Sequence, residues 1–171
     1  AYNVVDTTHP TTDVTDFDTH GTGVAGVIGA GEEAGTNGVV GMDWRVKIIP
    51  VKFGQYMGRD DPQHPPEQQG GYAENAVAAI GRIYGLKTIY GRNIVAVNAS
   101  WGVNPDEEDT NNLMQAITEL ESVSILFVTV AGNGKLDPPG SQNWVGYNID
   151  QTPQLPGSFS KTLGNVITVA A

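Results

Sequence analysis

Apolar residues recur along this chain in two kinds of pattern. Two segments repeat them every three or four positions, as on one face of a helix; these are residues 73–86 and 109–121. Short apolar runs, typical of buried strands, lie before, between and after them; these are residues 46–53, 93–97, 124–131 and 165–171. Strands that alternate with helices form βαβ units, so the pattern predicts an α/β fold with a parallel sheet.

The remaining segments are less regular. Residues 21–30, GTGVAGVIGA, are small and apolar almost throughout. The glycines lower the helix propensity of this segment, so we expect a helix only where packing against other elements holds it. Polar or glycine- and proline-rich stretches are predicted to be loops and turns; these are residues 1–19, 31–37, 59–71 and 134–160.

The ends of the predicted strands are the first candidates for a functional site. In parallel α/β sheets, ligands bind beyond the carboxyl ends of the strands. This rule points to residues 98–102, NASWG, and to Gly132-Asn133. The carboxamide of Asn133 could donate a hydrogen bond to negative charge that develops on an oxygen above the sheet. Gly-Asn after a strand is also common turn chemistry, so this pattern alone leaves both interpretations open.

Composition limits the classes of partner. The 171 residues carry a net charge of −10, which argues against nucleic acid or an anionic membrane as a partner. The chain contains no cysteine, which excludes disulfides and thiol catalysis. Its apolar runs are far shorter than the ~20 residues that span a bilayer.

The glycines after His20 formally match a nucleotide-binding motif. Gly21, Gly23 and Gly26 have the G-x-G-x-x-G spacing. That motif requires a strand that leads directly into the glycines. Residues 16–20, DFDTH, are polar and not strand-like, so the sequence disfavours nucleotide binding.

Five segments, taken in order, resemble the subtilase family of subtilisin-like serine proteases (peptidase family S8). HGTGVAGVIGA, from His20, is similar to the segment that carries the family's catalytic histidine. VNASWG resembles one wall of the substrate groove, and ILFVTVAGN resembles the strand that ends in the oxyanion-hole asparagine. GVVGMDWRVKIIPVKF resembles the glycine turn and strand that follow the histidine segment, and LPGSFSKTLGNVITVAA resembles the approach to the next core strand. The resemblance runs from about Phe17 to Ala171.

The resemblance implies a fold and an activity. The expected fold is a three-layer α/β domain with a mostly parallel sheet and helices on both faces. Residues 1–171 are expected to be a partial catalytic domain that is truncated at both ends. The implied activity is that of a serine-type endopeptidase, in which serine attacks the peptide carbonyl, histidine transfers the proton and aspartate orients the imidazole.

Particular residues take roles through this resemblance. His20 is implied as the general base and then the general acid, and Asn133 as the oxyanion donor. Residues that contact the substrate are implied on both sides of the groove: Ser100, Trp101 and Gly102 on one side, and Val130, Ala131 and Gly132 on the facing side, at the primary specificity pocket. For Trp101, a packing role is an equal alternative.

Two members of the triad are harder to place. The family's serine motif, Gly-Thr-Ser-x-x-x-Pro, does not occur in the sequence, so we expect these residues alone to be inactive and a longer parent protein to supply the nucleophile. Asp6, in Val-Val-Asp-Thr, resembles the family's aspartate, but little chain separates it from His20. An aspartate upstream of the chain is therefore preferred, and Asp18 is expected to be a supporting residue. The alternative function is an inactive pseudoprotease or peptide-binding module.

The resemblance also bears on cofactors and location. No cofactor is implied for the chemistry. The loop Gly31–Val39 is interpreted first as a solvated acidic loop; the alternative implied by the resemblance is a structural calcium ion, for which Glu32, Glu33 and Asn37 offer oxygens. The implied partner is a polypeptide substrate, and the implied location is secreted or extracytoplasmic.

Overall fold

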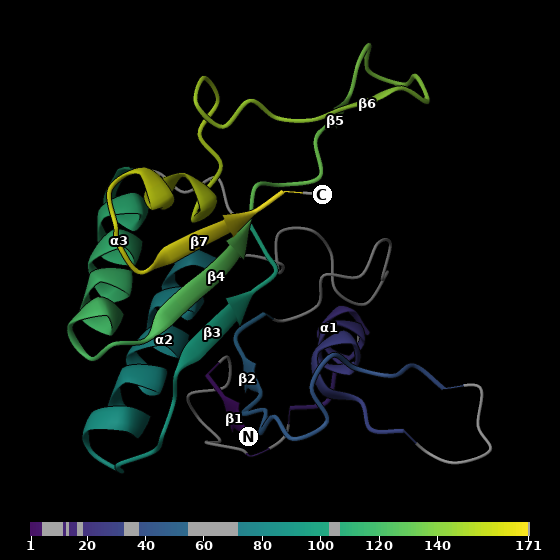
Figure 1. Ribbon diagram of the computed structural model, residues 1–171. Coiled ribbons are helices and arrows are strands. Elements are labelled where there is room, and N and C mark those ends of the chain that lie inside the picture. Colours follow the sequence, from purple (N-terminus) through teal and green to yellow (C-terminus); the bar gives the residue numbers. More distant parts are fainter. Residues whose placement is uncertain are drawn as a thin grey trace, which may run out of the picture. The chain divides into compact units, whose positions relative to one another are not determined.

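The computed structural model describes residues 1–4, 12, 14–16, 19–32, 38–54, 72–102 and 107–170. The chain forms two compact units, residues 1–71 and 72–171, and each unit is described by itself (Figure 1). Within the described residues, none of the helices combines the length and the apolar character that crossing a membrane requires.

The second unit is built on a parallel sheet of three strands in the order β3-β4-β7. The strands are β3 Ala96–Ala99, β4 Leu126–Val130 and β7 Val166–Val169. The helix α2, Tyr72–Thr88, precedes β3, and α3, Glu107–Ser122, precedes β4. The two helices pack against each other on one face of the sheet (Figure 1). The α/β class, the βαβ order and the parallel pairing predicted from the sequence are confirmed.

The core of this unit lies between the helices and that face of the sheet. Leu113, Ile117 and Leu120 on α3 and Phe127 on β4 are fully buried. These α3 residues are spaced by three or four positions, which is why one stripe of the helix can face the sheet. The periodic segments of the sequence thus supply the core.

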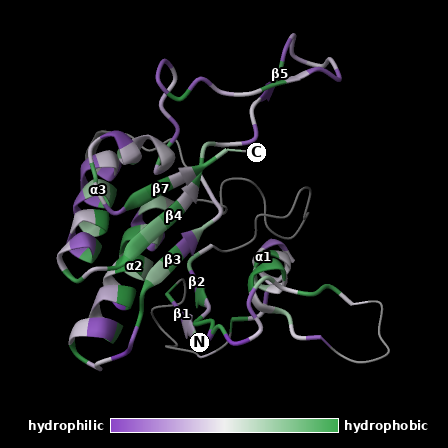
Figure 2. Ribbon diagram, in the orientation of Figure 1, coloured by the Kyte–Doolittle hydropathy of each residue, from purple (hydrophilic) through white to green (hydrophobic). Residues whose placement is uncertain are grey.

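The opposite face of the sheet is also apolar. Side chains alternate between the two faces along each strand, and Leu126, Ile167 and Val169 point away from the helical layer with 45%, 47% and 52% of their surface exposed. Figure 2 shows β4 and β7 coloured as hydrophobic along most of their length. Strands of this composition are typical of parallel sheets with both faces covered.

A buried asparagine ties the last strand to its neighbours. The Nδ2 of Asn165, just before β7, donates to the carbonyl oxygens of Ile117 (3.1 Å) and Ile125 (3.2 Å). Phe127 N donates to the backbone oxygen of Asn165 at 2.8 Å. One residue therefore joins α3, the start of β4 and the start of β7.

The first unit contains β1 Tyr2–Asn3, α1 His20–Gly29 and β2 Val51–Lys52. The strands β1 and β2 pair in parallel, and Val4 N extends the pairing by donating to Lys52 O at 2.9 Å. After α1 the chain folds back against the carboxyl-terminal end of this helix, where Gly41 N donates to Ala30 O at 2.8 Å. A Cβ on Gly41 would lie 2.4 Å from Ala30 N, so this close approach requires glycine.

The structure corrects several boundaries. Residues 1–19 include β1, so their assignment to loop alone was wrong. The strand predicted at 46–53 is reduced to β2, which begins directly after Pro50, a residue with no N–H to donate. The strand predicted at 93–97 lies instead at Ala96–Ala99, as β3. The predicted loop 134–160 contains the antiparallel pair β5 Lys135–Leu136 and β6 Trp144–Val145, and the 3₁₀ helix η2, Gly157–Lys161, begins within it. The proline-rich residues 59–71 lie outside the described residues.

Candidate active site

The carboxyl ends of β3 and β4 lie side by side. The parallel register aligns Ala99, the last residue of β3, with Thr129, one residue before the end of β4, so the segments that follow the two strands leave the sheet at the same end. The buried hydroxyl of Thr129 donates to Ala99 O at 3.1 Å and joins the two strand ends. The structure therefore brings together the two segments predicted to flank a substrate, whereas contact with a substrate stays a prediction.

The segment after β3 is anchored by its tryptophan. The Trp101 ring meets Phe127 edge-on, with ring centroids 6.4 Å apart and an interplanar angle of 85°. Ser100 Oγ accepts a hydrogen bond from Asn98 Nδ2 at 2.9 Å. A Cβ on Gly102 would lie 3.4 Å from Leu155 O. Trp101 thus has a packing role, and a second role at a substrate subsite stays a prediction.

The segment after β4 presents Asn133 at a glycine turn. Ala131 N donates to Val169 O at 2.9 Å, which continues the pairing with β7. Gly132 and Gly134 then adopt φ values of +94° and +84°, which favour glycine. Asn133 between them is exposed, and its side chain is hydrogen-bonded to none of the residues that the structure describes. Its carboxamide is therefore available to donate to a bound group.

A tyrosine that sequence reasoning did not single out lies against this turn. A Cβ on Gly132 would be 3.1 Å from Tyr147 Cδ2 and 3.9 Å from Gln154 Cγ. The Tyr147 ring therefore borders the backbone of a predicted pocket residue. One aromatic residue in a long polar loop gives no periodic signal, which is why the sequence did not reveal it.

His20 is the first residue of α1, in the first unit, and is exposed. Thr19 before it has a left-handed backbone, with φ 66°. Gly21, Gly23 and Gly26 lie inside α1 and not in a turn that follows a strand, so the geometry of a dinucleotide-binding motif is absent. Because His20 and Asn133 belong to different units, their convergence stays a prediction.

The described serines have local partners. Ser122 and Ser160 donate their hydroxyls to the carbonyl oxygens of Glu119 and Gly157. Ser158 Oγ accepts from Gln154 N at 2.9 Å. Such contacts are typical of turn and cap residues.

Several other predicted residues lie outside the part of the chain that the structure describes. Asp6, Asp18, Glu33 and Asn37 are not among the described residues, whereas Glu32 is described and exposed. Within the described ranges, no group of three or more His, Cys, Asp or Glu side chains could hold a metal ion. Calcium in the loop Gly31–Val39 stays a prediction, and no catalytic step is assigned to it.

A sequence profile of the subtilase family matches residues 2–171. The chain belongs to this family. Two solved structures are similar to this subtilase chain: sphericase, at 23% identity, and the S41 psychrophilic protease, at 26% identity, each with a TM-score of 0.66. Each comparison covers 99% of this chain and 45% of the other, so the chain spans less than half of either structure. None of the curated protein sequences matches it significantly. The subtilisin-like α/β fold predicted from the sequence is confirmed.

Proposed function

We propose that this chain provides part of the active site of a serine-type endopeptidase, with His20 as general base and Asn133 as oxyanion donor. The observation that carries the proposal is the turn after β4, the strand next to β3, where the exposed Asn133 lies between Gly132 and Gly134. A side-chain amide at such a position can stabilise the oxyanion of a tetrahedral intermediate. Family membership supports the same chemistry.

In the proposed reaction, an extended peptide lies between residues 100–102 and 130–132 and pairs with their backbone. The serine hydroxyl attacks the carbonyl carbon of the peptide while His20 accepts its proton, and His20 then delivers that proton to the leaving amine. Negative charge develops on the carbonyl oxygen, to which Asn133 donates. The reaction requires His20 and Asn133 to converge over one cleft.

The nucleophile is proposed to come from outside these 171 residues. The sequence contains no Gly-Thr-Ser-x-x-x-Pro string, and the hydroxyls of Ser122, Ser158 and Ser160 are engaged in local hydrogen bonds. Because the members of a triad act as a unit, His20 without a serine would retain no proportionate share of the activity. We therefore expect the 171 residues alone to hydrolyse peptides at no useful rate.

The triad aspartate has two possible sources, Asp6 or a residue upstream. Support for Asp6 comes from the hydrogen bond from Val4 N to Lys52 O, which carries the β1–β2 pairing to within two positions of Asp6. In the full-length protein, Asp6→Asn is expected to lower kcat by roughly 10⁴-fold if Asp6 orients the imidazole. An Asp6→Asn enzyme with normal kcat would assign the role to an upstream aspartate.

Labelling of the full-length protein by a serine-directed fluorophosphonate tests the proposed function. We expect labelling of the wild type and loss of peptide hydrolysis in His20→Ala. Asn133→Ala should lower kcat by about 10²–10³-fold, the loss known for subtilisin's own oxyanion asparagine. Asn148→Ala is a matched control, because the side chain of this exposed asparagine accepts a local hydrogen bond from Asp150 N. Peptide binding without labelling or hydrolysis would instead indicate the pseudoprotease alternative.

The proposal extends to location. Subtilisin-like proteases that act on external polypeptides are exported, so we expect the full-length protein in the extracellular or extracytoplasmic fraction. Fractionation of the producing cells, followed by immunodetection, measures this directly. Recovery only in the cytoplasm would contradict it without affecting the proposed chemistry.

A further inference from the structure

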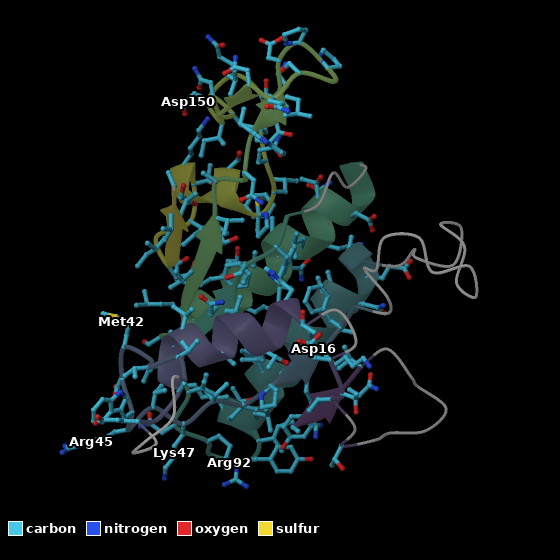
Figure 3. All side chains as sticks on the ribbon, turned by 90° about the vertical axis from the view of Figure 1, so that its right-hand side faces the viewer. Asp16, Met42, Arg45, Lys47, Arg92 and Asp150 are labelled. Atoms are coloured by element: carbon cyan, nitrogen blue, oxygen red, sulfur yellow. The ribbon has the colours of Figure 1, made fainter. Side chains whose placement is uncertain are left out.

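A single carboxylate holds the amino-terminal end of α1. Asp16 Oδ1 accepts a hydrogen bond from Thr19 N at 3.0 Å. Its Oδ2 accepts from both the backbone N (2.7 Å) and the Oγ1 (2.7 Å) of Thr22. Figure 3 labels Asp16 at this end of α1. The hydrogen bonds therefore reach the chain on both sides of His20.

The local backbone depends on this support. Thr19 has φ 66° and ψ −10°, and its side chain makes no capping hydrogen bond. The first turn of α1 contains no acidic residue. A non-glycine residue in the left-handed region persists where the surrounding structure holds it, and here Asp16 holds the Thr19 amide. Its negative charge also suits the positive end of the helix dipole.

We propose that Asp16 is a positioning residue for the His20 imidazole. The proposal rests on the proposed function, because it assigns to Asp16 the task of aiming a general base. With the amides of Thr19 and Thr22 fixed to one carboxylate, the backbone of His20 between them has little freedom. The direction of the imidazole is then set by its own side-chain torsions, which is the preorganisation that proton transfer requires.

The first test compares variants at Asp16 in the full-length protein. Asp16→Ala should lower kcat by roughly 10- to 100-fold, the effect of misplacing a catalytic group by about 1 Å. KM should change by less than about twofold, because substrate contacts are retained. Asp16→Asn should recover part of kcat, since its amide oxygen can still accept one of the hydrogen bonds.

Asp43→Ala is the matched control for these variants. Asp43 Oδ1 accepts from Arg45 N at 2.8 Å, and Asp43 N donates to Ile28 O near the other end of α1. The control therefore removes a carboxylate and the hydrogen bond that it accepts from Arg45 N, and it keeps the backbone hydrogen bond to Ile28 O. It should leave kcat within about twofold of the wild type, as expected for a change away from the reacting groups.

A second-site change separates positioning from a general loss of stability or charge. Thr19→Gly in the Asp16→Ala background should raise kcat several-fold, because glycine adopts the left-handed conformation without the support of Asp16. If Asp16→Ala does not fold, Asp16→Asn with and without Thr19→Gly provides the same comparison.

The outcomes separate the two proposals. An active wild type with unchanged kcat in Asp16→Ala, a change in KM alone, or no recovery with Thr19→Gly would overturn the positioning role only. A wild type that neither reacts with the fluorophosphonate nor hydrolyses peptides would overturn the proposed function and, with it, this inference.

Discussion

Gly157 lies against the carboxyl end of β4, the central strand of the sheet. It begins η2 and is buried. A Cβ added there would lie 2.4 Å from Val130 O and 3.3 Å from Thr168 Cγ2. Val130 is the last residue of β4 and is predicted to border the specificity pocket. A Gly157→Ala substitution therefore tests whether the packing of η2 and the geometry of the pocket are linked.

The size of the effect follows from the distances. Ordinary contact begins near 3.4 Å, so the alanine methyl group must move away from the Val130 oxygen by about 1 Å. The Val130 oxygen belongs to the backbone of β4 and cannot rotate away as a side chain can, and overpacking of this kind costs about 1–3 kcal/mol. Thr168 Oγ1 donates to Gly157 O at 2.6 Å, which resists the movement. A shift of about 1 Å in Val130 could also lower turnover by up to about 100-fold.

Gly81→Ala is the matched control. Gly81 lies inside α2, and a Cβ there would have no neighbour within 4 Å. Alanine should therefore stabilise the helix by about 0.5–1 kcal/mol. Urea unfolding of the full-length protein measures both changes as shifts in midpoint at constant slope. A Gly157→Ala protein that is as stable as the wild type would refute the close approach of η2 to β4.

Three further predictions concern other residues. Asn165→Ala should lower the free energy of unfolding, measured by urea titration, by about 1–3 kcal/mol, because it leaves a buried carbonyl without its donor. The control Asn143→Ala loses a similar hydrogen bond to Asp137 O at an exposed position, and it should cost less than about 0.5 kcal/mol. Tyr147→Ala should enlarge the space beside Gly132 and raise kcat/KM for substrates with larger side chains before the scissile bond by roughly 10-fold relative to small ones; an unchanged ratio in a peptide-library assay would exclude a role for Tyr147 in specificity. If the loop Gly31–Val39 binds calcium, EDTA should lower the melting temperature and excess Ca²⁺ should restore it, and identical melting curves would support the solvated loop.

Much of the second unit could be predicted because its signals are periodic. The apolar spacing on α3 and the β-branched run of β4 locate the elements whose side chains form the core. The ends of β3 were misplaced, because its first predicted residues, such as Ile94, are as apolar as those that pair. The strand β1 was missed, because a strand of two residues is too short to show an alternating pattern.

Less of the candidate site than of the core could be predicted from the sequence. The turn that carries Asn133 could be predicted because it follows the strongest strand and contains the glycines at 132 and 134, whereas the role of Asn133 stays a prediction. Asp16 could not be distinguished from the other acidic residues near His20, because its role depends on a left-handed Thr19 that no composition rule reveals. Tyr147 was missed because its neighbour is Gly132, which is distant in sequence.

The apolar face of the β3-β4-β7 sheet that points away from α2 and α3 has a practical consequence for anyone who prepares this protein. On this face Leu126, Ile167 and Val169 form an apolar strip along the adjacent strands β4 and β7. Apolar patches of this kind promote self-association when nothing shields them. A recombinant piece cut at residue 72 would carry that strip into solution, and losses to precipitation during purification should be expected before any biochemical measurement begins.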